Sequence, residues 1–173
     1  MKNPKELVIG VLKSEEGFNC TPYIDTLGHP TIGYGRLCSD KTFSSREEAL
    51  KSCSPYAPIC TKETALNWLF DDIDKFISCI ETTSIIKRAY DKCPNYRKAI
   101  LISMAYQMSC SKLSTFIKTL QYMEEEKWDE ASEEMLDSVW AKNQTQKRAK
   151  RHSKVIKYNN CENIMDICSY YGW

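Results

Sequence analysis

Apolar side chains return at every third or fourth position along most of the chain, which is the spacing of amphipathic helices. The first such stretch, with Leu7, Val8 and Leu12, predicts a helix over residues 4–16. A second, over residues 61–80, would span about 30 Å and could connect two lobes. The same spacing and helix-start signals predict further helices over residues 44–52, 84–91, 95–108, 115–125, 128–137, 140–143, 147–157 and 161–169.

Residues 18–36 have a different pattern. Aromatic and β-branched residues lie there among turn-forming glycines and prolines, which predicts short twisted strands joined by tight turns. The predicted fold class is therefore α+β and mostly helical. We expect one domain over residues 1–173, made of a small β-containing lobe (14–60), a connecting helix (61–80) and a helical lobe (81–173) on which helix 1–13 packs.

The composition is that of a folded chain with nearly balanced charge. Hydrophobic residues make up 42% and charged residues 27%, with 24 basic against 23 acidic side chains, so neither disorder nor a nucleic-acid partner is expected. No apolar run approaches the ~18 residues of a bilayer span, so we expect no membrane insertion. We also expect the protein to be a monomer. Eight acids in residues 124–137 and seven bases in 142–157 indicate two solvated helix faces or, alternatively, a basic face beside an anionic polymer.

Nine cysteines are spread along the chain without any C-x-x-C pair. With only two histidines, His29 and His152, no ligand set is complete, and we expect neither a metal nor another cofactor. So many cysteines indicate disulfides and a secreted or lumenal protein whose leader has been removed. The odd count leaves at least one thiol, and Cys38, Cys53 and Cys60 are candidates for a local staple; the spacing leaves the full pairing open.

Two carboxylates stand out as candidates for chemistry. Glu16 follows Val8 and Leu12 at intervals of four, at the end of the apolar stripe of the first helix. A carboxyl group partly shielded from water can keep a proton and deliver it as a general acid, although a solvated residue at a frayed helix end would fit the spacing too. Asp25 lies nine residues later in the β region, where it is either a turn former or the second, charged carboxylate that cleavage of a glycosidic bond requires.

Five segments of the chain form a pattern in a fixed order and spacing: Glu16-Gly17, Tyr23-Ile24-Asp25-Thr26-x-Gly28-x-x-Thr31-Ile32-Gly33-Tyr34-Gly35-x-Leu37, Ile102-Ser103-Met104-Ala105-Tyr106-Gln107-Met108, Lys127-Trp128-Asp129-Glu130-Ala131 and Trp140-x-x-Asn143-Gln144-Thr145-x-x-Arg148-Ala149-Lys150-Arg151. In these segments, and over most of its length, the chain resembles the phage-type lysozymes, the endolysins of the T-even phages. This family implies a lysozyme-like fold. It also implies a bacteriolytic, antimicrobial glycosidase whose partner is bacterial cell-wall peptidoglycan.

The family resemblance also implies a reaction and its residues. The bond cleaved is the β-1,4 link between N-acetylmuramic acid and N-acetylglucosamine, with inversion at the anomeric carbon. Glu16 is then the general acid, Asp25 supports the attacking water or the developing oxocarbenium charge, and Thr31 helps to place that water. The positions implied in substrate binding are Leu37, Tyr106 and Thr119, with Gln107 beside them, and Arg148, which matches the arginine that approaches the catalytic glutamate.

The chain departs from the family at several positions. Arg36 replaces a histidine, and we expect it to pair with Asp72; Glu134 replaces an asparagine that contacts sugar. The nine cysteines and the net charge of +1 indicate a secreted relative, with a phage protein delivered from the cytosol to the wall as the alternative. Residues 163–173 have no clear counterpart, and Cys161 and Cys168 are candidates to pin them.

Other functions remain open at this point. The fold could serve as a non-catalytic wall-binding module, and the same carboxylates would serve a chitin-directed glycosidase. The basic helix over 147–157 could disrupt membranes, although its apolar face is small.

Overall fold

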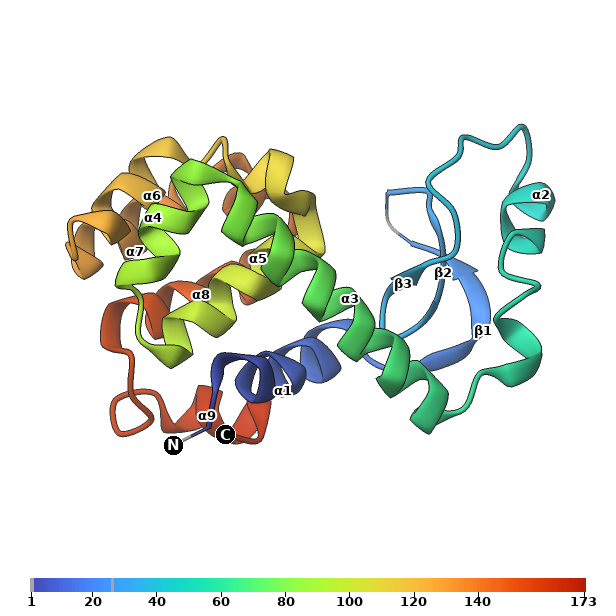
Figure 1. Ribbon diagram of the computed structural model, residues 1–173, viewed down its shortest axis with the longest axis horizontal. Helices are drawn as coiled ribbons and strands as arrows, with labels where there is room; N and C mark the ends of the chain where they lie inside the picture. The colour runs from blue at the N-terminus through green and yellow to red at the C-terminus, as the bar shows by residue number, and fades with distance from the viewer. Residues whose placement is uncertain (1, 26) are drawn as a thin grey trace. The chain divides into compact units, whose positions relative to one another are not determined.

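The computed structural model describes residues 2–25 and 27–173 (Figure 1). Met1 and Thr26 lie outside the described residues, so the Thr26 position of the sequence motif has no structural account. The elements in chain order are α1 (Pro4–Glu16), β1 (Asn19–Ile24), β2 (Pro30–Gly33), β3 (Arg36–Leu37), α2 (Arg46–Lys51), the 3-10 turn η1 (Ala57–Ile59), α3 (Lys62–Thr82), α4 (Ser84–Lys92), α5 (Asn95–Leu113), α6 (Ile117–Glu124), α7 (Trp128–Leu136), the π-helical turn η2 (Trp140–Gln144), α8 (Gln146–Tyr158) and α9 (Met165–Tyr171).

The predicted fold class is confirmed, since helices dominate and the strands fall within residues 19–37. Several predicted helix ends differ from the structure by one or two residues, and two are clearly wrong. The last helix begins at Met165 instead of 161, because Asn159 ends α8 in a left-handed conformation and a loop follows. Helix α5 runs beyond 108 to Leu113, with a break at Ser109, whose φ of 70° and ψ of 158° are not helical.

The chain divides into two compact units. The small unit comprises residues 12–72, and the helical unit comprises residues 73–173 together with α1 up to Val11. The divisions therefore fall inside α1 and inside α3. Across the described residues, no helix combines the length and the apolar character that crossing a bilayer needs.

An antiparallel sheet in the order β1-β2-β3 forms the centre of the small unit. Tyr23 on β1 lies opposite Thr31 on β2, and Thr31 lies opposite Leu37 on β3. Disulfides tie this sheet to its surroundings, because Cys38 joins Cys53 after α2 and Cys20 joins Cys60 after η1. Of the three cysteines expected to form a local staple, Cys38 and Cys53 thus pair with each other, whereas Cys60 pairs with Cys20.

The predicted ion pair of Arg36 is confirmed. Its Nη1 lies 2.9 Å from Oδ2 of Asp72, and both side chains are largely buried. The guanidinium also lies over the rings of Tyr56 and Trp68, 5.2 and 5.7 Å from their centroids. Because guanidinium groups stay charged and stack well on aromatic rings, this arrangement joins the end of the sheet to the first half of α3.

Helix α5 provides the core of the helical unit, with Ile100, Leu101 and Met104 fully buried. The two charged stretches of the sequence meet here, because α7 packs against α8. Lys157 on α8 lies 3.4 Å from Asp129 on α7, and Lys142 pairs with Asp137. Part of the basic stretch is thus neutralised within the protein.

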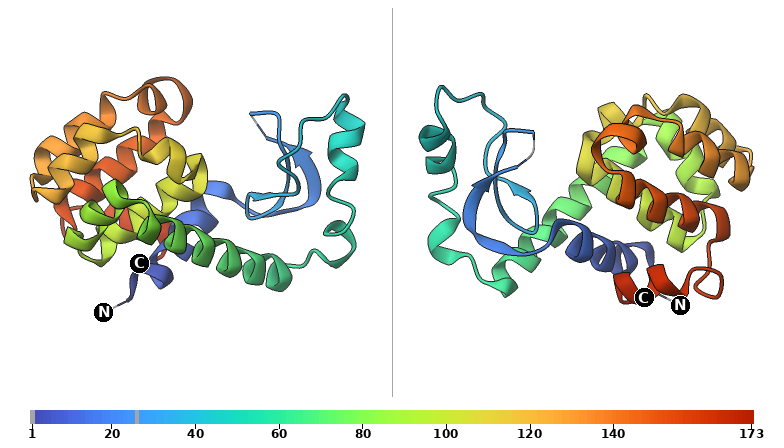
Figure 2. Two further views of the ribbon diagram at one scale, coloured as in Figure 1. Left: turned by 45° about the horizontal axis from the view of Figure 1, so that its top comes forward. Right: turned by 180° about the vertical axis from the view of Figure 1, so that it is seen from behind.

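The C-terminal segment lies along α1 (Figure 2). The indole Nε1 of Trp173 donates to the carbonyl of Leu7 at 2.9 Å. A Cβ added at Gly10 would lie 2.2 Å from the carbonyl oxygen of Tyr171, so only glycine allows this close approach. The disulfide between Cys161 and Cys168 closes the segment, as the sequence indicated.

His152 is a buried polar residue in the middle of the helical unit. Its ring lies among those of Trp140 and Tyr171, its Nε2 is 3.4 Å from Oγ of Ser103, and its Nδ1 has no hydrogen-bond partner in the described part of the chain. Burial, and then the charges of Arg148 and Arg151, hold the pKa of His152 well below its ordinary value. The folded protein therefore keeps this imidazole neutral.

We expect acid to destabilise the fold through His152. Because its folded pKa is lower than the unfolded one, the stabilisation is complete above about pH 6.5 and is lost as the pH falls. The free energy of unfolding of the wild type should drop by up to about 2 kcal/mol more than that of His152→Leu between about pH 6.5 and 5. Urea unfolding at several pH values measures this, and parallel pH curves would contradict it.

Candidate active site

Glu16 is the last residue of α1, where buried Val8 and Leu12 precede it on the same face. Its own side chain is partly exposed. Gly35, with a φ of 76°, brings the backbone of the sheet close to this carboxyl: a Cβ there would lie 3.1 Å from Oε2 and 3.2 Å from Cγ of Glu16. The missing side chain of Gly35 therefore makes the space that the Glu16 carboxyl occupies.

Asp25 follows β1 directly and holds the turn to β2. Its Oδ1 accepts hydrogen bonds from the backbone amides of Leu27, at 2.9 Å, and His29, at 2.8 Å. The Asp25 amide in turn donates to the carbonyl of His29 at 2.9 Å. Asp25 is thus a turn former, one of the two interpretations of its place in the sequence, and the turn fixes its carboxyl.

Thr31 is buried on β2 and connects to the same turn. Its Oγ1 donates to the carbonyl of His29 at 3.1 Å. Leu37, its neighbour on β3, is exposed over 44% of its surface, which suits a contact with a ligand. The site residues predicted in the small unit therefore lie at the end of α1 and on adjoining parts of one sheet.

Tyr23 links the two carboxylates electrostatically. Burial raises the pKa of its phenol, and the negative charges of Glu16 and Asp25 raise it further. Both carboxylates therefore act on one hydroxyl group. In the sequence, Tyr23 stood out only as part of a motif. The two-residue period of a strand, which gives positions 23 and 25 the same face, was a signal that could have identified it.

The remaining predicted site residues lie in the helical unit. The rings of Tyr106 on α5 and Phe76 pack together with their centroids 5.4 Å apart. Oε1 of Gln107 accepts a hydrogen bond from the indole of Trp140 at 3.2 Å. Arg148 on α8 is buried, and its Nη2 donates to Oγ of Ser103 at 3.0 Å. These contacts give the three side chains defined positions.

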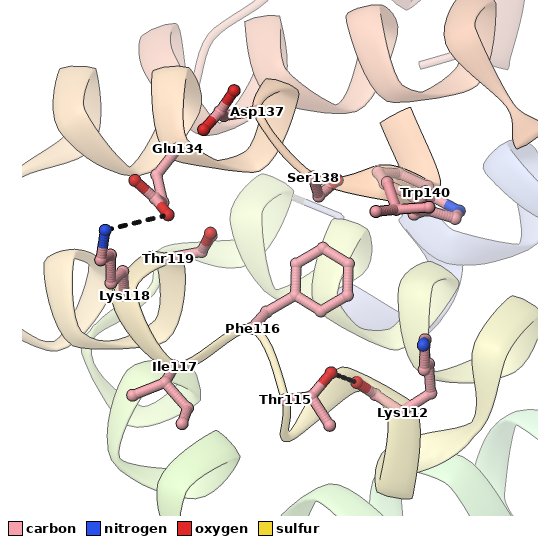
Figure 3. A pocket seen from close by; sticks show the side chains of 11 residues that line it. Lys112, Thr115, Phe116, Ile117, Lys118, Thr119, Glu134, Asp137, Ser138 and Trp140 are labelled. Atoms are coloured by element: carbon pink, nitrogen blue, oxygen red, sulfur yellow. Dashed lines mark hydrogen bonds and ion pairs between the residues drawn. The ribbon is translucent and has the colours of Figure 1, made fainter. Parts of the chain in front are cut away.

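Thr119 on α6 lines a pocket of about 390 Å³ in the helical unit (Figure 3). The rings of Phe116 and Trp140, 6.1 Å apart, give the pocket apolar surfaces. Lys118 and Glu134 add charge, with Nζ and Oε1 4.0 Å apart. The sequence pattern pointed to Thr119, Glu134 and Trp140. It missed the other lining residues because they come from separate helices and the connections between them: Lys112, Thr115, Phe116, Ile117, Lys118, Asp137, Ser138 and Val139.

Carboxylates, hydroxyls and amides dominate the candidate site. Over the described ranges, no three histidine, cysteine, aspartate or glutamate side chains gather as ligands of a metal ion would. The groups present can donate and accept protons and hold a water molecule, which is the chemistry of hydrolysis by acid and base.

A sequence model of the family described as phage lysozyme matches residues 13–155. The chain belongs to the phage lysozyme family. It is 33% identical over 156 residues to probable T4-type lysozyme 1 of Dictyostelium discoideum, with 85% of this chain and 91% of that protein covered. Probable T4-type lysozyme 2 of the same organism is 32% identical over 158 residues, again covering 85% of this chain and 91% of that protein.

A phage protein is similar as well. The pre-baseplate central spike protein Gp5 of Enterobacteria phage T4 is 27% identical over 168 residues, which are 92% of this chain and 29% of that protein. Membership of the phage lysozyme family makes this chain a glycoside hydrolase of the lysozyme class, with peptidoglycan as its general substrate.

We predict that Gly35→Ala lowers kcat by more than its loss of stability explains. The new Cβ would meet the Glu16 carboxyl, and displacing this candidate catalytic group by a fraction of an ångström should cost at least about tenfold in kcat. Gly172→Ala is the matched control, because Gly172 has a similar φ of 69° and open space around it.

Both glycine variants should lose about 1–2 kcal/mol of stability from the left-handed backbone conformation. Thermal unfolding and kcat for hydrolysis of cell walls measure the two effects separately. Equal kcat values for the two variants would show that Gly35 leaves Glu16 undisturbed.

Proposed function

We propose that the chain is a single lysozyme domain that cleaves the β-1,4 bond between N-acetylmuramic acid and N-acetylglucosamine with inversion. Glu16 protonates the oxygen of the leaving sugar. Asp25 and Thr31 hold the water that attacks the anomeric carbon from the other side. This assignment uses one carboxylic acid and one carboxylate in different surroundings, as hydrolysis of a glycoside by inversion requires.

The observation that carries this proposal is the close approach of the small unit's backbone to the Glu16 carboxyl at Gly35, where an added Cβ would lie 3.1 Å from Oε2. The pKa of the Tyr23 phenol, which burial raises first and the charges of Glu16 and Asp25 raise further, supports the placement of both carboxylates near this hydroxyl. Asp25 and Thr31 are joined through the backbone of His29, which supports their action on one water molecule. In the inverting geometry about 6.5–9.5 Å separates the two carboxyl groups, which leaves space for that water.

Each unit carries its own proposed substrate-binding residues. Leu37 is exposed beside Thr31, as an apolar contact for a sugar ring would be. In the helical unit, the pocket lined by Thr119 offers aromatic faces and charged groups, and a ligand with acetyl groups and polar substituents presents both characters. Tyr106, Gln107 and Arg148 complete the proposed binding residues, held by the contacts described above.

We also infer that the protein works outside the cell as a bacteriolytic, antimicrobial monomer. Four disulfides support this inference, because such bonds persist in oxidising compartments. The ninth cysteine, Cys93, is a buried thiol, and burial raises its pKa to about 12, so it stays protonated and unreactive.

Replacing Glu16 by Gln should abolish the clearing of a bacterial cell-wall suspension. The amide has the shape of the acid and no proton to deliver, so the rate should fall by about a hundredfold to ten-thousandfold with the fold intact. Glu15→Gln is the control, since it makes the same change at the neighbouring residue of α1. Turbidity and circular dichroism measure activity and folding, and clearing by the folded Glu16→Gln protein would refute the assignment.

The stereochemistry of the product tests the mechanism independently. Direct attack by water inverts the anomeric carbon, whereas a covalent intermediate on Asp25 would retain its configuration. Proton NMR, recorded within the first minutes of hydrolysis of a soluble peptidoglycan oligosaccharide, should show the α-anomer first. An initial β-anomer would exclude the proposed role of Asp25.

A further inference from the structure

His29 lies between the two side chains that are proposed to hold the attacking water. Its amide donates to Oδ1 of Asp25 at 2.8 Å, and its carbonyl accepts from the amide of Asp25 at 2.9 Å and from Oγ1 of Thr31 at 3.1 Å. These three contacts belong to the backbone. The imidazole makes a fourth, with Nδ1 3.5 Å from Oδ2 of Asp25.

The two oxygens of Asp25 have different surroundings. Oδ1 already accepts hydrogen bonds from the amides of Leu27 and His29. A carboxylate oxygen has two lone-pair sites, so these bonds occupy Oδ1. Oδ2 is therefore the oxygen that can accept a hydrogen bond from water, and it is also the oxygen that the imidazole of His29 approaches.

The imidazole is half exposed, with 49% of the side chain accessible. The titratable and charged groups around it come from several segments. Asp25 contacts it from the end of β1, and Tyr23 lies on β1 opposite Thr31. Asp40, Lys41 and Arg46, from the segment that leads into α2, line a pocket of about 470 Å³ together with His29. Among these groups, Asp25 is the one that a positively charged His29 side chain would contact directly.

We propose that His29 is a positioning residue whose charge decides whether Oδ2 of Asp25 is available to the attacking water. This inference rests on the proposed function. A protonated imidazole donates a charge-assisted hydrogen bond to Oδ2 and weakens its attraction for the proton of water. A neutral imidazole leaves Oδ2 to water, so hydrolysis is fast.

The proposal makes the enzyme slower in acid for a reason separate from unfolding. Histidine is the side chain that ordinarily changes charge between pH 5 and 8, whereas an ordinary aspartate stays ionised there. A decline of the wild-type rate relative to that of a variant with a fixed charge at position 29 is the effect that this proposal assigns to His29. Because the backbone contacts of residue 29 do not depend on its side chain, substitutions isolate the imidazole.

Two variants fix the charge at this position. His29→Gln is neutral at every pH, and His29→Arg is always positive. The measurement is kcat on a soluble peptidoglycan oligosaccharide from pH 5 to 7.5, with release of reducing ends as the readout. Lys41→Gln is the matched control, because it removes a positive charge from the same pocket. Thermal unfolding at each pH separates loss of activity from loss of structure.

Relative to His29→Gln, the wild type and Lys41→Gln should lose about tenfold in kcat between pH 7.5 and 5; this comparison cancels any effect of pH on Glu16, which all these proteins share. His29→Arg should be about tenfold slower than His29→Gln over the whole range, and about tenfold slower than the wild type at pH 7.5. A His29→Gln profile parallel to that of the wild type would overturn the inference, whatever its absolute rate, and so would full activity of His29→Arg at neutral pH.

The outcomes also separate this inference from the proposed function. If Glu16→Gln is inactive and the His29 variants follow the wild-type profile, only the role of His29 fails. If Glu16→Gln hydrolyses the oligosaccharide as fast as the wild type, the proposed function itself fails.

Discussion

The small unit depends on the turn that Oδ1 of Asp25 holds between β1 and β2. The amides of Leu27 and His29 need an acceptor, and this carboxylate oxygen provides it. The same turn places the carbonyl of His29 where Thr31 donates to it, so one interaction sets the positions of three neighbouring residues. Asp25 closes the turn with Oδ1 and keeps Oδ2 for the proposed reaction. The same side chain is therefore needed both for the fold and for the proposed catalysis.

The two units meet their stability requirements in different ways. The small unit has only about 60 residues, too few for a large core, and two disulfides together with the Arg36–Asp72 pair hold its sheet and loops. The helical unit buries α5 among other helices and joins the acidic α7 to the basic α8. With part of the basic stretch neutralised in this way, short-range contacts at the site should matter more for substrate binding than attraction by net charge.

Much of the fold could be predicted from local pattern. The bounds Pro4–Glu16 of α1 agree with the prediction. Helix α2 begins at Arg46, within the range that the helix-start signals predicted, and Ser45 before it accepts a hydrogen bond from the amide of Glu48. Motif positions also named Glu16, Asp25 and Thr31. The electrostatic effect of Glu16 and Asp25 on Tyr23 and the backbone contacts of His29 now connect them. The catalytic roles of these residues stay predictions, and so do the predicted lobe boundaries. The spacing of residues along the chain does not establish either of them.

The sequence by itself determined where most helices and strands lie, because periodicity and capping depend on residues a few positions apart. Only the tertiary structure decided which cysteines pair, that Gly35 makes room for Glu16, and that the imidazole of His29 faces the second oxygen of Asp25. These features join segments that are distant along the chain or arise from the path of one turn. Since such contacts leave no periodic trace in the sequence, the folded chain alone reveals them.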